Sequence, residues 1–168
     1  MPRGARRTVR SRGLRAARYE FGGRFRAPLG FVYRWCLDYS PEDPKIEGSG
    51  GIRRIAARSA REVVYEDLEE APTGWNWSHI VVTKRPPNGW HAKITGSHRH
   101  WTLEYSLREL PDGSTELRAR GRRRPTEIGG SNPPKAELER ELNTMWTRYG
   151  RALERDYRAS QRARPRRS

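Results

Sequence analysis

The chain has 168 residues, of which 35 are Lys or Arg and 20 are Asp or Glu, and its formal net charge is +15. This length suits one domain with a sizeable core, and no run of apolar residues approaches the ~18 that a membrane-spanning helix needs. The single cysteine, Cys36, excludes an internal disulfide and a cysteine-based metal cage, and we expect neither a metal nor a cofactor. The arginine-rich N-terminus lacks the apolar segment of a secretory signal, so a cytoplasmic location is expected.

Most of the positive charge lies at the two ends of the chain. Residues 1–18 hold seven arginines and residues 158–168 hold five, and neither range contains an acidic residue. Both are poor in apolar residues, so we predict two disordered basic tails around a domain that spans residues 19–157. Such tails can bind nucleic acid or an anionic membrane. The alternative is a compositional bias, since arginine outnumbers lysine 31 to 4 in the whole chain.

The first predicted elements are a strand and a short helix. The stretch "RYEFGGRFRAP" is typical of a strand, in which Gly22 and Gly23 indicate a bulge or sharp bend. The next stretch, "PLGFVYRWCLD", has apolar residues at helical spacing, and Pro28 fits its first turn. Two prolines in "DYSPEDPKIEG" end this helix, and that segment has room for one further helical turn.

Several short strands follow, separated by turn signals. The stretches "IRRIAARS" and "REVVYEDLEE" flank one turn, and "GWNWSHIVVTK" and "WHAKITG" flank the turn "RPPNG". Strand alternation places Trp75, Trp77 and His79 together on one face, and Trp90 leads the apolar face of the next strand. Strands joined in this way predict an antiparallel meander.

The clearest strand pattern is the hairpin "HWTLEYSLRELPDGSTELRARG". Trp101, Leu103 and Tyr105 alternate with polar residues, and "PDG" supplies the turn. The opposite face is polar: we expect Arg118 and Arg120 to point to solvent and to form a basic patch with "GRRRP". His98 and His100 are also expected on this outer face, where they make a poor zinc site.

A long helix is predicted at the C-terminal end of the domain. Ser131 or Asn132 can cap it, and Pro133 or Pro134 fits its first turn. Its apolar stripe is longer than five turns and must lie across the apolar face of the sheet. The stripe consists of Leu138, Leu142, Met145, Trp146, Tyr149, Leu153 and Tyr157.

This order of elements resembles the helix-grip (START-like) superfamily, which includes polyketide cyclase/dehydrase and lipid-transport families. The resemblance covers about residues 19–157 and is carried by "FGGRFRAPLGFVYRWCLDYSPED" and by the hairpin above. It implies an α+β fold in which a curved antiparallel sheet of six to seven strands wraps around the long C-terminal helix. It also implies a cavity for an apolar or aromatic ligand between sheet and helix, and it brings no shared catalytic triad.

The first functional hypothesis is that this cavity binds a hydrophobic or aromatic small molecule or a lipid. Aromatic side chains give a large contact area together with a polar group, which suits a flat ligand. The alternative is that the same residues only fill the core. The candidate ligand-binding residues are Trp75, Trp77, Trp90, Trp101, Leu103, Tyr105, Met145, Trp146 and Tyr149.

Two further hypotheses remain open. The cavity of a polyketide cyclase/dehydratase-type enzyme would need groups that move protons, and the candidates are His79, Tyr105 and Tyr149. The alternative for His79 is a histidine that is hydrogen-bonded within the sheet. The third hypothesis is nucleic-acid or anionic-membrane binding through the arginine-rich tails and "GRRRP".

Overall fold

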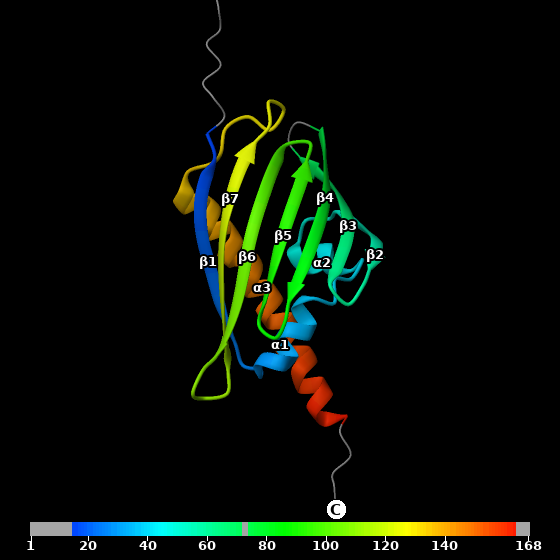
Figure 1. The fold of residues 1–168 in the computed structure, drawn as a ribbon, viewed down its shortest axis with the longest axis vertical. Helices are drawn as coiled ribbons and strands as arrows, with labels where there is room; N and C mark the ends of the chain where they lie inside the picture. Colours follow the sequence, from blue (N-terminus) through cyan, green and yellow to red (C-terminus); the bar gives the residue numbers. More distant parts are fainter. Residues whose placement is uncertain (1–14, 72–73, 164–168) are drawn as a thin grey trace, which may run out of the picture.

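The structure is a computed structural model that describes residues 15–71 and 74–163. Within these residues the fold is α+β, with seven strands and three helices, as the sequence predicts (Figure 1). No helix of the described residues is both long enough and apolar enough to cross a membrane. The elements in chain order are β1 (Ala17–Phe25), α1 (Leu29–Cys36), α2 (Asp43–Glu47), β2 (Ile52–Arg58), β3 (Glu62–Ala71), β4 (Gly74–Arg85), β5 (Gly89–Gly96), β6 (Arg99–Glu109), β7 (Thr115–Pro125) and α3 (Lys135–Arg162).

All neighbouring strands are antiparallel, in the order β1-β7-β6-β5-β4-β3-β2. From β2 to β7, strands that follow one another in the chain are neighbours, whereas β1 pairs with β7, so β1 and β2 are the two edges of the sheet. The predicted hairpin is β6–β7, and Gly113 in its turn has the positive φ of 76° that glycine tolerates. In Figure 1, α3 runs behind the sheet and leaves the other face open to solvent.

The core lies between α3 and the inner face of the sheet. Tyr19 and Phe25 on β1 and Leu153 on α3 are almost fully buried, and Phe21 stacks on Trp146 with a centroid distance of 6.3 Å. Among the strands, α3 contacts β1 most extensively. The helix thus covers one half of the inner face closely, and α2 contacts both α3 and β2 beside the other half.

Polar side chains of α3 also bond the free edge of the sheet. Beyond β1 no further strand exists in the described residues, so half of the N–H groups of β1 have no ladder partner. Three side chains on one side of α3 accept hydrogen bonds from backbone N–H groups of β1 or of the residue after it. The pairs are Glu20 with Glu139 (2.8 Å), Gly22 with Asn143 (3.2 Å) and Arg26 with Glu154 (2.8 Å).

The predicted bounds of the domain and the predicted cap of α3 need correction. The domain extends past residues 19–157, because β1 begins at Ala17 and α3 continues to Arg162; the rest of the predicted tails lies outside the described residues. Neither Ser131 nor Asn132 caps α3: Pro134 is the N-cap residue and makes no side-chain cap bond. The Asn132 amide instead donates to the carbonyl of Arg15 at 2.9 Å, which ties the start of α3 to the start of β1.

Of the bulge or sharp bend predicted at Gly22 and Gly23, the bulge is not found. The register of β1 with β7 is continuous from Ala17 to Phe25. Glycine is needed at position 22 for a different reason: a Cβ atom there would lie 2.5 Å from the carbonyl oxygen of Leu117. The glycine therefore allows a close backbone approach within a regular ladder.

Candidate functional site

A cavity of about 380 Å³ lies between the inner face of the sheet and helices α2 and α3. Its volume falls in the range of small-molecule sites, about 300–1,000 Å³. One wall comes from β4, β5, β6 and α3 and is mainly apolar. Residues of this wall include Ile80, Trp90, Ala92, Ile94, Leu103, Tyr105, Leu142, Met145 and Trp146.

Aromatic rings form a continuous surface along this apolar wall. Trp90 and Tyr105 lie on neighbouring strands and stack with a centroid distance of 4.7 Å and an interplanar angle of 13°. Tyr105 then contacts Trp146 (5.7 Å), and Trp146 contacts Tyr149 (5.4 Å). The inner face of β5 and β6 therefore meets the stripe of α3 in one aromatic surface.

The structure brings together seven of the nine candidate ligand-binding residues on the cavity lining. Because they share the inner faces of β5, β6 and α3, strand alternation and helical spacing were enough to place them. That they bind a ligand stays a prediction. The seven residues are Trp90, Trp101, Leu103, Tyr105, Met145, Trp146 and Tyr149.

The predicted inward orientation of Trp75, Trp77 and His79 is wrong. The side chains of Trp75 and Trp77 are 60% and 43% exposed, and none of the three is among the described residues that line the cavity. Trp77 and His79 stack on the outer face, with ring centroids 6.4 Å apart. His79 therefore has no access to a ligand in the cavity and is not a candidate acid or base there.

The physical reason is the two-residue period of β4. Ile80 and Val82 are buried in the core, which fixes the even-numbered residues of this strand inward. The same alternation turns Asn76 and Ser78 inward and the two tryptophans outward. The aromatic character of Trp75 and Trp77 had suggested that their face of this half of the strand points inward.

A second wall of the cavity, beside the apolar one, is ionic. The side chain of Arg53 on β2 is almost fully buried, and its guanidinium lies over the ring of Tyr65, 4.4 Å from the ring centroid. It donates to Asp43 at 2.9 Å, to Glu47 at 3.0 Å and to Asp67 at 2.8 Å. Helix α2 thus supplies two carboxylates and β3 supplies the third.

Tyr149 joins this ionic wall to the aromatic surface. Its hydroxyl donates a short hydrogen bond to the Glu47 carboxylate. Burial raises the pKa of Tyr149, and the negative charge of Glu47 raises it further. Burial also raises the pKa of Tyr105. Both candidate phenols are therefore neutral hydrogen-bond donors at neutral pH, and neither is suited to act as a base.

A second polar group lies farther along β3. Glu69 faces Arg99 of β6 at 3.5 Å and accepts from the Asn76 amide at 3.5 Å. Burial raises the pKa of Glu69, against the effect of Arg99. Arg99 also lies over the ring of Trp101, at 5.5 Å from the centroid.

Sequence reasoning did not find this ionic wall. Asp67 and Glu69 share the parity of the buried residues Val63 and Tyr65, so strand alternation could have placed them inward. The position of Arg53 opposite Asp67 depends on the β2–β3 register, which has a shift between Ile55 and Ala57. No local signal in the sequence shows that α2 supplies the other two carboxylates.

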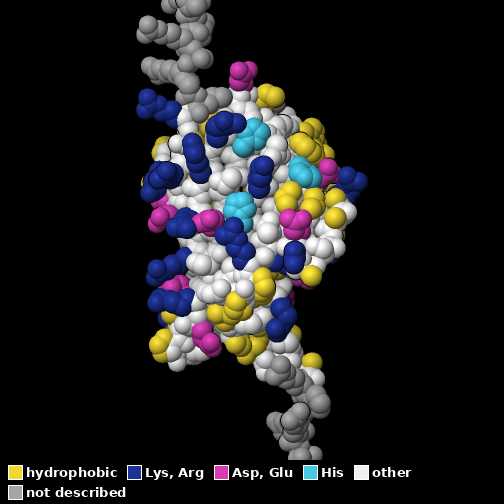
Figure 2. Space-filling model, in the orientation of Figure 1, with side chains coloured by type: hydrophobic (Ala, Val, Ile, Leu, Met, Phe, Trp, Pro, Cys, Tyr) yellow, Lys and Arg dark blue, Asp and Glu magenta, His cyan; other side chains and the backbone are white. Residues whose placement is uncertain are grey.

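Two predictions for the polar outer face also need correction. His98 is buried, and its Nδ1 lies 3.1 Å from the Ser97 hydroxyl. Arg123, the middle arginine of "GRRRP", turns inward and lies over Trp101 at 5.2 Å. The arginines that alternate with it (Arg118, Arg120, Arg122 and Arg124) are exposed as predicted. Figure 2 shows Lys and Arg side chains spread over this open face of the sheet.

Comparison with solved structures decides the type of fold. The aromatase/cyclase ZhuI from Streptomyces sp. R1128 superposes with a TM-score of 0.68 and 14% identity over 89% of this chain and 98% of that chain. A START superfamily protein from Mycobacterium smegmatis has a TM-score of 0.61 and 14% identity, over 84% of this chain and 97% of its own. This protein has a START-like helix-grip fold.

Other structures share the helix-grip fold at similarly low identity. A protein described as Ara h 8.0201 has a TM-score of 0.62 and 11% identity over 86% of this chain and 99% of its own. No family model matches the sequence, and no curated protein matches it. Identities at this level support the helix-grip architecture alone and do not show a function.

Proposed function

We propose that the protein binds a hydrophobic small molecule with an aromatic or flat body in the cavity between the sheet and α3. The observation that carries the proposal is the aromatic surface formed by Trp90, Tyr105 and Trp146 beside an internal space of about 380 Å³. Stacked and edge-on rings favour a planar ligand over water in such a space.

Blocking the cavity tests this proposal with a neutral fluorescent probe, N-phenyl-1-naphthylamine. Ile94 points into the cavity, and its neighbour on β5, Lys93, is exposed on the other face. We expect Ile94→Trp to weaken probe binding by about tenfold or more, since the added ring occupies the ligand space. The matched variant Lys93→Trp should bind like the wild type. Equal binding by all three proteins, measured by titration, would place the probe elsewhere.

A second candidate function is a cyclase-type enzyme that uses the same cavity. Its support is the likeness to aromatase/cyclases such as ZhuI, together with the Tyr149–Glu47 hydrogen bond at the edge of the aromatic surface. In this role the neutral phenol of Tyr105 donates a hydrogen bond to a ketone oxygen of a folded poly-β-ketone, and the phenol of Tyr149 does so when it gives up its bond to Glu47. These bonds strengthen as negative charge develops on the oxygens during ring closure.

Cyclisation of a synthetic poly-β-ketone thioester, followed by mass spectrometry, tests the enzyme candidate. Tyr105→Phe should lower the rate by about 10²-fold and leave probe binding in place, because the ring stays and only the donor is removed. Tyr157→Phe is the control, since this residue lies on α3 but contacts Phe31 outside the cavity. A rate over the uncatalysed background that no cavity variant changes would exclude this function.

A further inference from the structure

The lining of the cavity has more acidic than basic residues, whereas the chain as a whole is strongly basic. The full sequence has a net charge of +15. Among the described residues that line the cavity, in contrast, seven are acidic and two are basic. The two bases are Arg53 and Arg99, so acidic residues are in excess in the lining although the chain contains 31 arginines.

The excess is greatest at the ionic wall. Three carboxylates surround the one guanidinium of Arg53, and each has a side chain that is about 85% buried. One guanidinium neutralises only one of them, so net negative charge remains in a partly dry environment. In keeping with this, burial raises the pKa of Asp43 and of Asp67 despite their bonds to Arg53.

Three further carboxylates lie at the opening of the cavity. Asp38, Glu42 and Asp156 belong to the lining and have exposed side chains, which places them at the solvent end of the space. Each is paired with a base outside the lining, namely Arg58, Lys45 and Arg155. These pairs balance the charge at the opening, so the unbalanced negative charge belongs to the ionic wall.

The aromatic rings of the lining also favour a positively charged ligand. Ring faces attract cations, and the protein already uses this interaction for Arg53 over Tyr65 and for Arg99 over Trp101. The apolar wall on β5, β6 and α3 is next to the ionic wall, and Tyr149 belongs to both. A ligand with an apolar ring system and one positive group can therefore contact both walls at once.

We infer that the ligand class of this cavity is an aromatic or polycyclic amine, with its rings against Trp90, Tyr105 and Trp146 and its ammonium group toward Asp43, Glu47 and Asp67. This inference rests on the proposed function and narrows its ligand. A neutral compound of the same size makes the apolar contacts but leaves the negative charge of the carboxylates unbalanced. An acidic compound is repelled by them.

Three ligands with the same ring system test the inference: 2-(2-naphthyl)ethylamine, 2-(2-naphthyl)ethanol and 3-(2-naphthyl)propanoate. We expect the amine to bind about tenfold or more tightly than the alcohol, because a cation near a partly buried carboxylate gains far more than in water. The propanoate should bind most weakly. Isothermal titration calorimetry with the full chain gives the three dissociation constants.

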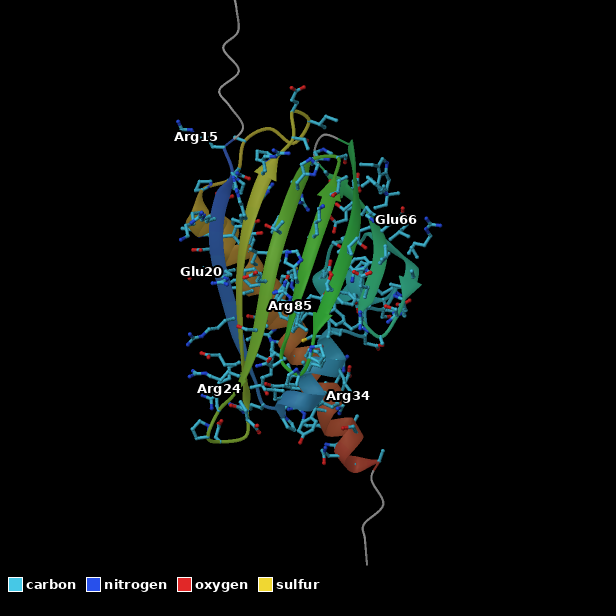
Figure 3. All side chains as sticks on the ribbon, in the orientation of Figure 1. Arg15, Glu20, Arg24, Arg34, Glu66 and Arg85 are labelled. Atoms are coloured by element: carbon cyan, nitrogen blue, oxygen red, sulfur yellow. The ribbon has the colours of Figure 1, made fainter. Side chains whose placement is uncertain are left out.

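A charge-neutral variant locates the effect within the cavity. Glu47→Gln keeps an oxygen that can accept from Arg53 and Tyr149 but removes one negative charge. The preference for amine over alcohol should fall to about threefold or less, while the affinity for the alcohol stays the same. Glu66→Gln is the matched control, because Glu66 lies on the open face of β3 (Figure 3). Asp43→Asn, which removes one negative charge from the same wall, makes the same test if circular dichroism shows that Glu47→Gln is unfolded.

The outcomes separate the inference from the proposed function. Equal affinities for the three ligands, or a preference for the alcohol or propanoate, overturn the amine inference and leave ligand binding in place. A preference for the amine that neither cavity variant reduces also overturns it, since the carboxylates would then not be responsible. Failure of all three ligands and of the neutral probe to bind removes the proposed function itself.

Discussion

At the scale of single residues, Gly22 and Gly23 are neighbours on β1 with different surroundings. A Cβ atom on Gly22 would lie 2.5 Å from the Leu117 carbonyl oxygen, whereas on Gly23 it would meet only the Phe25 ring at 3.7 Å. We expect Gly22→Ala to lower the free energy of unfolding by about 1–3 kcal/mol, because backbone atoms of β7 must move.

Gly23→Ala is the control for this prediction. Alanine there makes ordinary contacts and reduces the freedom of the unfolded chain, so its effect should lie between zero and a gain of about 1 kcal/mol. Urea unfolding measures both variants. Equal losses in the two would show that strand propensity, and not the close approach to β7, determines the effect.

The buried carboxyl of Glu69 makes a prediction about pH. Its pKa is raised by burial in the folded protein, so the folded state holds the proton more tightly than the unfolded state does. Its contribution to stability is present below the unfolded value of about 4.3 and is lost as pH rises through the folded pKa. The unfolding free energy of the wild type minus that of Glu69→Gln should therefore fall as pH rises from 4 toward neutrality. Urea unfolding at intervals of about one pH unit measures this difference.

Glu104 supplies the opposite case for comparison. Its bond to Arg120 lowers the pKa of its carboxyl, so its contribution is present above the unfolded value and is lost as pH falls. The corresponding difference for Glu104→Gln should rise with pH. Slopes of the same sign for both variants would contradict the assignment for Glu69.

At the scale of elements, the bonds between α3 and β1 depend on matched spacing. Four residues along a helix rise about 6 Å and two residues along a strand about 6.7 Å, so successive acceptors can meet alternate N–H groups. Glu139 and Asn143 do this for Glu20 and Gly22. The double variant Glu139→Ala/Asn143→Ala should lose about 1–3 kcal/mol of stability and exchange those two amide hydrogens faster.

The adjacent residues on α3 provide the control. Arg140 and Thr144 are exposed, and the Thr144 hydroxyl bonds only within its own helix. Arg140→Ala/Thr144→Ala should therefore stay within about 0.5 kcal/mol of the wild type. Hydrogen exchange at β1 that is equal in the two double variants would show that the edge needs no support from α3.

At the scale of the whole molecule, opposite charges are kept apart. The cavity is acidic and the open face of the sheet is basic (Figure 2). Residues 1–14 and 164–168 add five and three arginines and no acidic residue. If these ends bind polyanions, their deletion should make binding to a single-stranded oligonucleotide weaker and much less dependent on salt, because fewer counterions are released.

The structure sets the limits of that deletion. Removal of all of residues 1–18 would cut into β1, and removal of residues from 158 onward would shorten α3. Affinity for N-phenyl-1-naphthylamine should be unchanged in the shorter protein, which shows that the fold is intact. Oligonucleotide binding that survives with its full salt dependence would move the site to the exposed arginines of β7, among them Arg122 and Arg124.

The sequence by itself determined the order of elements, the β6–β7 hairpin and the apolar stripe of α3. Strands and helices show hydrophobic periods of two and 3.6 residues, and these periods can be recognised within one short segment of the sequence. For the same reason most of the aromatic cavity wall could be predicted. Each of its members, such as Trp90 or Trp146, lies on a face that its own element defines.

Only the tertiary structure decided which face of β4 is inward and where the ionic wall lies. The core contacts of Ile80 and Val82 outweigh the aromatic character of Trp75 and Trp77, and a strand cannot turn both sets inward. Arg53, Glu47 and Tyr149 come from three distant segments that meet through strand register and the docking of α2 on α3. Local periodicity contains no information about such contacts, so the charge of the cavity follows from the fold and not from the net charge of the chain.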